Sequence, residues 1–283
     1  MTYRHYNIGP SDLVLEIGSG HDPVRRSDVL SDRYVDTSEE RGSTLVQDAR
    51  PFIAADAQAL PFKDKVFDYL ICQHVLEHAN DPTVFIAEIT RVSKRGYIET
   101  PSRFHEMIYA PKHYHRWVLD YRNGQLIIAP KDESFINHVG LIFTELWRRN
   151  PNFRAFHQSA PELMFSFFEW DDHIDYQMLD HFDPQFNIED YVEAIDLASQ
   201  RACPRRFRHK LSTLYHRSRA LLQPIRQKMR GHHIQRTVDI DRLLCCPEPQ
   251  CRGDFRKEKD HYLCNKCGLD YPIVDNIPRF SKE

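Results

Sequence analysis

The sequence lacks any apolar run that approaches the roughly 18 residues needed to span a bilayer. Residues 1–10 also lack the apolar core of a signal peptide. A large net charge is missing too: the formal charge is −3 with 41% hydrophobic residues, which excludes a disordered, highly charged chain. We therefore expect a folded cytoplasmic protein without a transmembrane segment. Its 283 residues allow one sizeable α/β domain and a small appendage.

Cysteine is nearly absent before residue 245, where only Cys72 and Cys203 occur. The other five crowd the tail, and in a reducing compartment such crowding indicates a metal site rather than disulfides. Two pairs have the spacing of thiolate knuckles that bind tetrahedral zinc. The predicted structural zinc ligands are Cys246, Cys251, Cys264 and Cys267. Cys245 is the alternative to Cys246, but the Cys-Pro dipeptide favours Cys246, and we expect His261 to be a surface residue.

Acidic residues are absent between Leu197 and Val238, where 11 Lys and Arg occur. Leucines such as Leu211 and Leu214 fall at helical spacing there, which predicts a basic amphipathic helix interrupted at Pro224. Such a helix can lie on an anionic membrane, bind nucleic acid, or dock on an acidic surface of the same protein. The stretch is therefore interpreted as a linker whose partner stays open.

The segment LVLEIGSGHDP, residues 13–23, predicts a buried parallel strand followed directly by a glycine turn. Gly18 and Gly20 allow a backbone to approach a ligand at the carboxyl end of the strand, where open α/β sheets bind nucleotides. Glu16 argues against a phosphate loop or a dinucleotide site, because a carboxylate in the cradle would repel phosphate. An E-x-G-x-G loop instead suits a ligand with a cationic end.

Acidic residues follow the next two predicted strands. An acid at the tip of the second strand can accept hydrogen bonds from both hydroxyls of a ribose, and Asp32 is our first choice for this role. Asp36 is the competitor, since its distance from Gly18 is nearer the usual spacing of about 20 residues. The third strand, PFIAADA, ends in Asp56 and Ala57.

A fourth strand, FDYLIC, is followed by Gln73 and His74. Asp81 and Pro82 then have the residue types of an N-cap and a first helical position, and GYIETP reads as a fifth strand. Strands that alternate with short helical segments predict an α/β fold with a doubly wound, largely parallel sheet.

Five motifs in this order resemble the class I S-adenosylmethionine-dependent methyltransferases, in particular a large bacterial group with a DA-x-x-LPF, FD and VLEH signature. They are VLEIGSG, the acid pair, ADAQALPF, FDYLICQHVLEH and RVSKRGYIETP, within residues 13–101. The resemblance implies S-adenosylmethionine as cofactor and a Rossmann-like sheet with an antiparallel last strand. It assigns the methionyl part to Glu16, Gly18 and Gly20, the ribose to Asp32 or Asp36, the adenine to Asp56 and Ala57, and the place beside the sulfonium to Gln73.

The sequence beyond residue 101 predicts a hairpin at Asn123-Gly124, then a helix, then a second hairpin, MFSFFEW-DD-HIDYQM, as the last two strands of the sheet. Residues 104–117 are interpreted either as a substrate lid or as a structural flap. The CP, C-x-x-C and YPIVDNIP block of the tail looks like the zinc-ribbon activator proteins that pair with tRNA and protein methyltransferases. We expect a methyltransferase domain over 1–196 with an insertion around 102–160, a basic helical linker over 197–238, and a zinc ribbon over 239–283.

The favoured function is methyl transfer from S-adenosylmethionine to an oxygen or nitrogen of a small molecule or of a glycan or natural-product intermediate, because the catalytic domain has no basic excess. For a hydroxyl acceptor the candidate bases are His78 and His113, chosen from five histidines that include His74, His105 and His115. One alternative is an RNA or protein methyltransferase that docks through the ribbon and linker. A second is a non-enzymatic zinc-ribbon adaptor.

Overall fold

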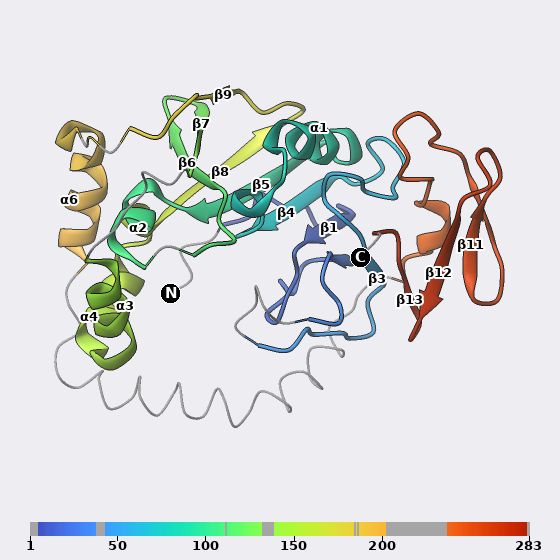
Figure 1. Ribbon diagram of the computed structural model, residues 1–283, viewed down its shortest axis with the longest axis horizontal. Coiled ribbons are helices and arrows are strands. Elements are labelled where there is room, and N and C mark those ends of the chain that lie inside the picture. Colours follow the sequence, from blue (N-terminus) through green and yellow to red (C-terminus); the bar gives the residue numbers. More distant parts are fainter. Residues whose placement is uncertain are drawn as a thin grey trace. The chain divides into compact units, whose positions relative to one another are not determined.

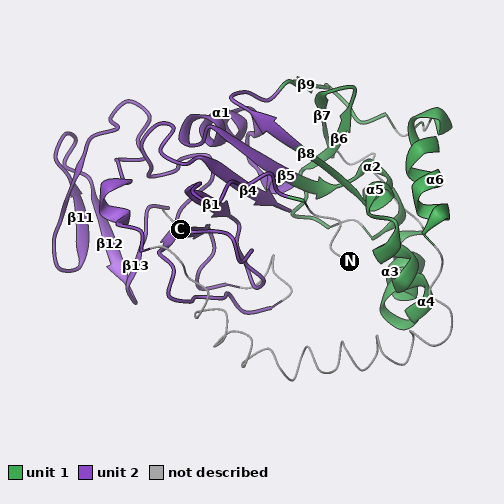
Figure 2. Ribbon diagram, turned by 180° about the vertical axis from the view of Figure 1, so that it is seen from behind, with its two compact units in different colours: residues 1–5, 99–168, 175–225 green, residues 6–98, 169–174, 226–283 purple. Residues whose placement is uncertain are grey.

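The computed structural model describes residues 5–37, 43–110, 112–131, 139–183, 185, 187–201 and 237–281. It divides into two compact units, drawn in two colours in Figure 2. Unit 1 comprises residues 1–5, 99–168 and 175–225, and unit 2 comprises residues 6–98, 169–174 and 226–283. The predicted linker falls almost entirely on residues 202–236, which lie outside the described part of the chain.

A six-stranded sheet has the order β3-β2-β1-β4-β5-β8 (Figure 1). Strand β1 pairs in parallel with β2 and β4, and β2 pairs in parallel with β3. The 3-2-1-4-5 part of this order is that of a doubly wound Rossmann-like sheet. The strands are β1 (Val14–Ile17), β2 (Val29–Asp32), β3 (Phe52–Ala54), β4 (Tyr69–Gln73), β5 (Arg95–Pro101) and β8 (Phe165–Asp171).

Every residue of β1, β2 and β3 is buried, and β1 is the buried strand that the apolar run before Gly18 predicts. The helical crossovers are fewer than predicted. Among the described residues the connections between β1, β2, β3 and β4 contain no α-helix, whereas the connection from β4 to β5 contains α1 (Pro82–Val92), which follows the short 3₁₀ helix η1 (Leu76–His78). Helix α1 begins as predicted, since the Asp81 carboxylate accepts hydrogen bonds from the N–H groups of Thr83 and Val84.

The tail forms a four-stranded antiparallel sheet, β10-β11-β12-β13, after a short 3₁₀ helix, η4 (Ile240–Arg242). Its last hairpin turns at Asp275 and Asn276, which both have positive φ, as a two-residue turn requires. The strands are β10 (Phe255–Lys257), β11 (His261–Cys264), β12 (Asp270–Val274) and β13 (Ile277–Pro278).

This small sheet belongs to unit 2 and meets the β3 edge of the large sheet (Figure 1). Arg279, just after β13, forms a parallel bridge with Ala54 of β3, and the Phe280 N–H donates to the Ala54 carbonyl at 2.7 Å. Ile277 packs in one buried cluster with Leu30 and Phe52. The YPIVDNIP segment thus covers apolar surface of the large sheet.

Unit 1 contains the predicted hairpin, β6 (Trp117–Arg122) and β7 (Gln125–Pro130), with Asn123 and Gly124 at positive φ in its turn. The second predicted hairpin is wrong. Strand β8 joins the large sheet, but β9 (Tyr176–Met178) pairs in parallel with β7 instead of folding back along β8. Asp172 at positive φ begins the departure, and the Leu126 N–H then bonds to the Asp175 carbonyl at 2.9 Å.

Strands β6, β7 and β9 form a three-stranded sheet. In sequence, the helices of unit 1 lie before β6, between β7 and β9, and after β9. Val118 and Ala129 of the hairpin pack with Phe182 in a buried cluster. Among the residues that the structure describes, no helix has the length and apolar character to cross a membrane. The helices are α2 (Arg103–Ile108), α3 (Gly140–Arg149), α4 (Pro151–Ser159), α5 (Pro161–Met164), η2 (Ile188–Tyr191) and α6 (Val192–Gln200).

Candidate functional site

The candidate cofactor residues lie at the carboxyl edge of four neighbouring parallel strands. In the sheet register Ile17 of β1 is level with Ser31 of β2 and Cys72 of β4. The next residue of each strand or turn is therefore Gly18, Asp32 or Gln73. Asp32 is in turn level with Ala54 of β3, so that Asp56 follows two residues beyond. This edge is where open parallel sheets bind nucleotides.

The glycine turn after β1 has the backbone that only glycine adopts without strain. Gly18 has φ +63° and Gly20 has φ +51°. A Cβ on Gly18 would lie 2.2 Å from Cγ2 of Val75, so this glycine is needed for packing against the β4 loop as well as for close approach. The Gly20 N–H donates to Oδ2 of Asp32 at 3.0 Å, which ties the turn to the tip of β2.

Glu16 points into the protein, where its carboxylate holds the crossover that follows the turn. Oε2 accepts from the Ser27 hydroxyl at 2.6 Å and from the Val24 N–H at 2.9 Å. Burial of this carboxyl, which is 4% exposed, raises its pKa from 4.5 to about 7, although the hydrogen bonds from Ser27 and Val24 and the charge of Arg50 act in the opposite direction. Glu16 therefore fixes the conformation of the crossover between β1 and β2 through these two hydrogen bonds.

The two acids considered for the ribose have different partners. Asp32 is 8% exposed and also accepts from the Tyr34 N–H at 3.0 Å, so its bonds to Gly20 and Tyr34 order the edge itself. Asp36 faces the tail, where its carboxylate pairs with the guanidinium of Arg279. Asp56 pairs with Arg33 at 3.1 Å and caps its own loop by accepting from the Gln58 N–H, next to the half-buried Ala57.

The histidines proposed as bases are placed differently from one another. His78 ends η1, and its Nε2 lies 3.8 Å from Oε1 of the buried Glu77, longer than a hydrogen bond. His74 has φ +56° and its Nδ1 is 3.6 Å from the same oxygen. His113 is exposed in the turn before β6, with its ring 5.1 Å from that of Tyr114. Near the strand edge, the Gln73 amide donates to the Tyr6 hydroxyl at 3.0 Å.

The four predicted zinc ligands come together in one group, with all four sulfur atoms within 4.8 Å of one another. The Cys246 and Cys267 sulfurs are 3.7 Å apart and those of Cys251 and Cys264 are 3.5 Å apart. A disulfide needs about 2.05 Å, whereas the edge of a tetrahedron with zinc–sulfur bonds of about 2.3 Å is about 3.8 Å. The donor set and spacing thus fit a four-thiolate zinc site. Cys245 and His261 are not in the group.

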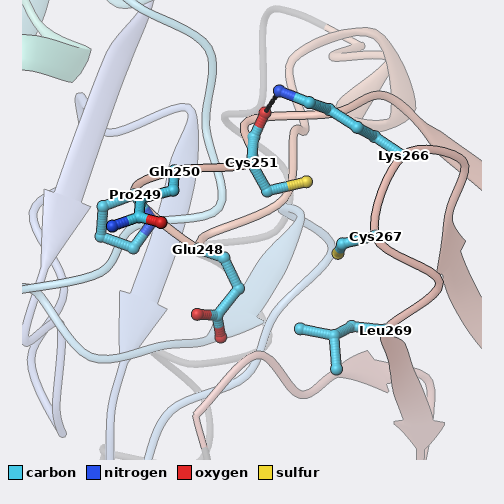
Figure 3. A pocket seen from close by; sticks show the side chains of 7 residues that line it. All are labelled: Glu248, Pro249, Gln250, Cys251, Lys266, Cys267 and Leu269. Carbon is cyan, nitrogen blue, oxygen red and sulfur yellow. Dashed lines mark hydrogen bonds between the residues drawn. The ribbon is translucent and has the colours of Figure 1, made fainter.

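An open hollow lies beside this cluster (Figure 3). Cys251 and Cys267 lie on facing sides of it, and the Lys266 ammonium donates to the Cys251 carbonyl at 2.7 Å. Since Cys267 is exposed, one side of the cluster is open to a chelator in solution. The hollow is lined by Glu248, Pro249, Gln250, Cys251, Lys266, Cys267 and Leu269.

Two arginines of the tail pair with acidic residues elsewhere in unit 2, and no sequence pattern predicts either pairing. Arg252 follows directly after Cys251, and its guanidinium pairs at 3.0 Å with Glu88 of α1, whose side chain is 7% exposed. Arg252 also donates to the Leu60 carbonyl at 3.3 Å. Together with the ion pair between Arg279 and Asp36, these contacts attach the tail to α1 and to the loop after β2. Such pairings between distant segments appear only in the folded structure.

Comparison with protein families finds that residues 24–98 match a family described as "Methyltransferase domain". The match covers the span from the loop after β1 to β5, which includes the acids after β2 and β3 and Gln73. This part of the chain is therefore similar to a methyltransferase domain. This finding argues against the adaptor alternative.

Similar proteins cover only parts of the chain. The uncharacterized protein MJ1123 of Methanocaldococcus jannaschii is 40% identical over 62 residues, 22% of this chain, and the chain spans 30% of the length of that relative. Among solved structures, YcgJ of Bacillus subtilis is 24% identical with a TM-score of 0.25, over 32% of this chain and 44% of that one.

Two further solved structures are similar at the same level. A complex that contains the Trm112 methyltransferase activator of Haloferax volcanii gives 20% identity and a TM-score of 0.28, over 34% and 47% of the two chains. The PH0226 protein of Pyrococcus horikoshii gives 23% and 0.27, over 38% and 61%. Similarities this low carry no argument about acceptor or partner.

Proposed function

We propose that the chain binds S-adenosylmethionine at the carboxyl edge of β3, β2, β1 and β4 and transfers its methyl group to an oxygen or nitrogen of a small molecule or glycan. The observation that carries this proposal is the level register of Gly18, Asp32 and Gln73, with Asp56 two residues beyond the level of Asp32. A single elongated nucleoside ligand can contact all four. When bound, the cofactor supplies an electrophilic methyl group on a sulfonium.

Each residue has a distinct part in this proposal. The positive-φ turn at Gly18 and Gly20 leaves room for the methionyl part, and Glu16 holds that turn from below through Ser27 and Val24. Asp32 is the better placed acid for the ribose, because it already bonds the glycine turn, whereas Asp36 is engaged by Arg279 of the tail. A carboxylate accepts about four hydrogen bonds, enough for the N–H groups of Gly20 and Tyr34 and for two adjacent hydroxyls.

At the other end of the ligand, Asp56 and Ala57 would face the adenine, and Gln73 would lie beside the sulfonium. Asp56 is oriented by Arg33 and by its own turn, so that its carboxylate is ordered before a ligand arrives. Order of this kind lowers the entropy cost of binding and of aligning the acceptor with the methyl group.

We further propose that residues 239–283 form a zinc ribbon, joined through a basic linker over 197–238 to a methyltransferase domain over 1–196. Four thiolates fill the zinc shell and leave no open position, so the metal would be structural. Its part would be to fold the segment that meets β3, through Ile277 and Arg279, and to place Arg252 on Glu88. Structural zinc contributes about 10–16 kcal/mol in small finger peptides, enough to fold a segment of this size.

The test is to incubate the purified chain with tritiated S-adenosylmethionine and an extract of the source cells, and then to separate small molecules, glycans, RNA and protein. Label in the small-molecule or glycan fraction supports the proposal. Label only in RNA or protein would replace it with the docking alternative, and RNA binding would then weaken steeply with salt. The Asp32→Asn variant is the control, since at a cofactor concentration below its dissociation constant it should lower labelling in every fraction.

A further inference from the structure

Helix α3 of unit 1 carries exposed apolar side chains on one side (Figure 1). Leu141 and Ile142 are 70% and 63% exposed. Six of the fifteen large apolar residues that are exposed in the described part of the chain fall within residues 139–156, so they gather here instead of being scattered singly. The side of α3 that we call the α3 face consists of Leu141, Ile142, Glu145, Leu146, Arg148 and Arg149.

The opposite side of α3 is fixed to the body of unit 1. Gly140 at the start of the helix is buried, and a Cβ there would lie 2.6 Å from the carbonyl carbon of Tyr109. The Thr144 hydroxyl accepts from the Ala110 N–H at 3.1 Å. Gly140 and Thr144 are four positions apart and therefore lie on the same side of the helix, which leaves the α3 face on the outer side.

Helix α4 holds α3 in this orientation but does not cover the α3 face. The Asn150 side chain caps α4 directly after the end of α3. The Arg154 guanidinium lies 5.1 Å from the centre of the Trp147 ring and donates to the Trp147 carbonyl at 3.0 Å. Gly140 is the one buried residue of α3, and α4 has none, so much of the apolar surface of these two described helices stays in water. Covering such a surface with another apolar one releases free energy.

The charge of this region is positive. The side chains of Arg148 and Arg149 are 65% and 82% exposed, and both pair with Glu145. Glu145 is the one acidic residue in the sequence 139–159, whereas Arg154 adds a third positive charge, so the three arginines less the one glutamate give a net charge of +2. Residues 197–238 of the same chain contain 11 Lys and Arg and no acidic residue. The occupant of the α3 face is therefore expected to be both apolar and anionic.

This combination distinguishes between the possible occupants. A second copy of the chain would bring arginines opposite arginines across a two-fold axis, where like charges repel. Nucleic acid is bound chiefly through positive charge and aromatic stacking, which leaves Leu141 and Ile142 without a role. The surface of an anionic bilayer, by contrast, accepts aliphatic side chains at the acyl boundary and arginines at the headgroups.

We propose that the α3 face docks this chain on a membrane surface that contains anionic lipids. Leu141, Ile142 and Leu146 enter the interface, and Arg148 and Arg149 contact the headgroups. Helix α3 has 10 residues and is about 15 Å long, half of the roughly 30 Å of bilayer hydrocarbon, so it lies along the surface and does not span it. The inference goes beyond the methyl transfer proposed above and does not depend on it.

The first test is co-sedimentation of the intact protein with vesicles of phosphatidylcholine, with and without phosphatidylglycerol. We expect binding to the anionic vesicles to be at least about tenfold tighter. The double variant Leu141→Ser/Ile142→Ser should bind the anionic vesicles about tenfold or more weakly, because it removes the aliphatic side chains that enter the interface. The matched control is Ile188→Ser/Ile195→Ser, which removes two exposed isoleucines elsewhere in unit 1 and should bind as the intact protein does.

Two results of this test would overturn the inference. One is failure of the intact protein to bind anionic vesicles. The other is equal binding by Leu141→Ser/Ile142→Ser, which would show that another part of the chain, such as the basic stretch 197–238, makes the contact. Circular dichroism of both double variants should match that of the intact protein, since all four positions are exposed.

The second test locates the contact without weakening it. In Leu141→Trp the new tryptophan should shift its emission to shorter wavelength with anionic vesicles and be quenched by brominated phospholipids, whereas the new tryptophan of Ile188→Trp should not. A tryptophan at position 141 that the lipid quencher does not reach would place the contact elsewhere and overturn the inference.

The third test separates the charge and the alternative occupant. Arg148→Gln/Arg149→Gln should weaken binding to anionic vesicles about fivefold or more and leave binding to pure phosphatidylcholine unchanged; unchanged binding to both would contradict the headgroup contact. Sedimentation velocity without lipid should find the intact protein and Leu141→Ser/Ile142→Ser in the same oligomeric state. A dimer that dissociates in this double variant would assign the α3 face to a second copy and overturn the inference.

Discussion

Replacing Glu16 with glutamine should change how the stability of the protein depends on pH. The Glu16 carboxyl is buried, and its pKa is raised from 4.5 to about 7 in the folded protein. Between these values the folded state keeps a proton that the unfolded state has lost. Stability from this residue is therefore complete below pH 4.5 and is lost as the pH rises through about 7.

The magnitude follows from the two pKa values. At about 1.4 kcal/mol for each pH unit, the change from 4.5 to about 7 corresponds to about 3 kcal/mol. A glutamine at this position does not titrate. The free energy of unfolding of Glu16→Gln, taken relative to that of the original protein, should thus increase by about 3 kcal/mol between pH 4.5 and pH 8, because only the original protein loses this stability.

Urea unfolding at a series of pH values measures this difference. Glu189→Gln is the matched control, because the Glu189 side chain is exposed in η2 and its replacement should leave the pH dependence unchanged. A difference between Glu16→Gln and the original protein that stays constant within about 0.5 kcal/mol across this range would refute the account of the buried carboxyl.

Three further predictions concern stability and metal. Gly18→Ala should destabilise by about 2 kcal/mol or more, since φ is +63° and the new Cβ would meet Val75, and Val75→Ala should restore part of the loss in a double variant measured by urea unfolding. Elemental analysis should find one zinc per chain, and Cys264→Ser should lower both the zinc content and the melting temperature; equal values for the two proteins would contradict the zinc site. Arg252→Met should cost about 1–2 kcal/mol by removing a charged hydrogen bond from the buried Glu88, and an unchanged unfolding curve would show that Arg91 alone satisfies this carboxylate.

Local patterns in the sequence were sufficient for much of the fold. The apolar run before Gly18 forms a buried strand, Asp81 and Pro82 begin a helix, and Asn123-Gly124 forms the hairpin turn, because each depends on neighbouring residues alone. The four-cysteine group also follows from short spacings, since each knuckle is a local loop.

Pairings between distant segments could not be predicted in this way. Strand β9 pairs with β7, about 50 positions earlier. This pairing was not predicted, because nothing in the sequence of β9 distinguishes β7 from β8 as its partner. Arg279 meets Asp36 across 243 positions, and this contact distinguishes Asp36 from Asp32, the first choice for the ribose in the sequence analysis. Glu16 was expected to suit a cationic ligand end, and in the folded chain its carboxylate is bound to Val24 and Ser27.

The measurement that tests the central claim most directly is titration calorimetry of S-adenosylmethionine into the intact chain and into two variants, Asp32→Asn and Asp36→Asn. The account predicts one bound cofactor per chain. Asp32→Asn should weaken binding at least tenfold, about 1.4 kcal/mol for a lost charged hydrogen bond. Asp36→Asn should have little effect, because Asp36 is engaged by Arg279. No binding to the intact chain, or equal affinity in Asp32→Asn, would contradict a cofactor site at the carboxyl edge of the sheet.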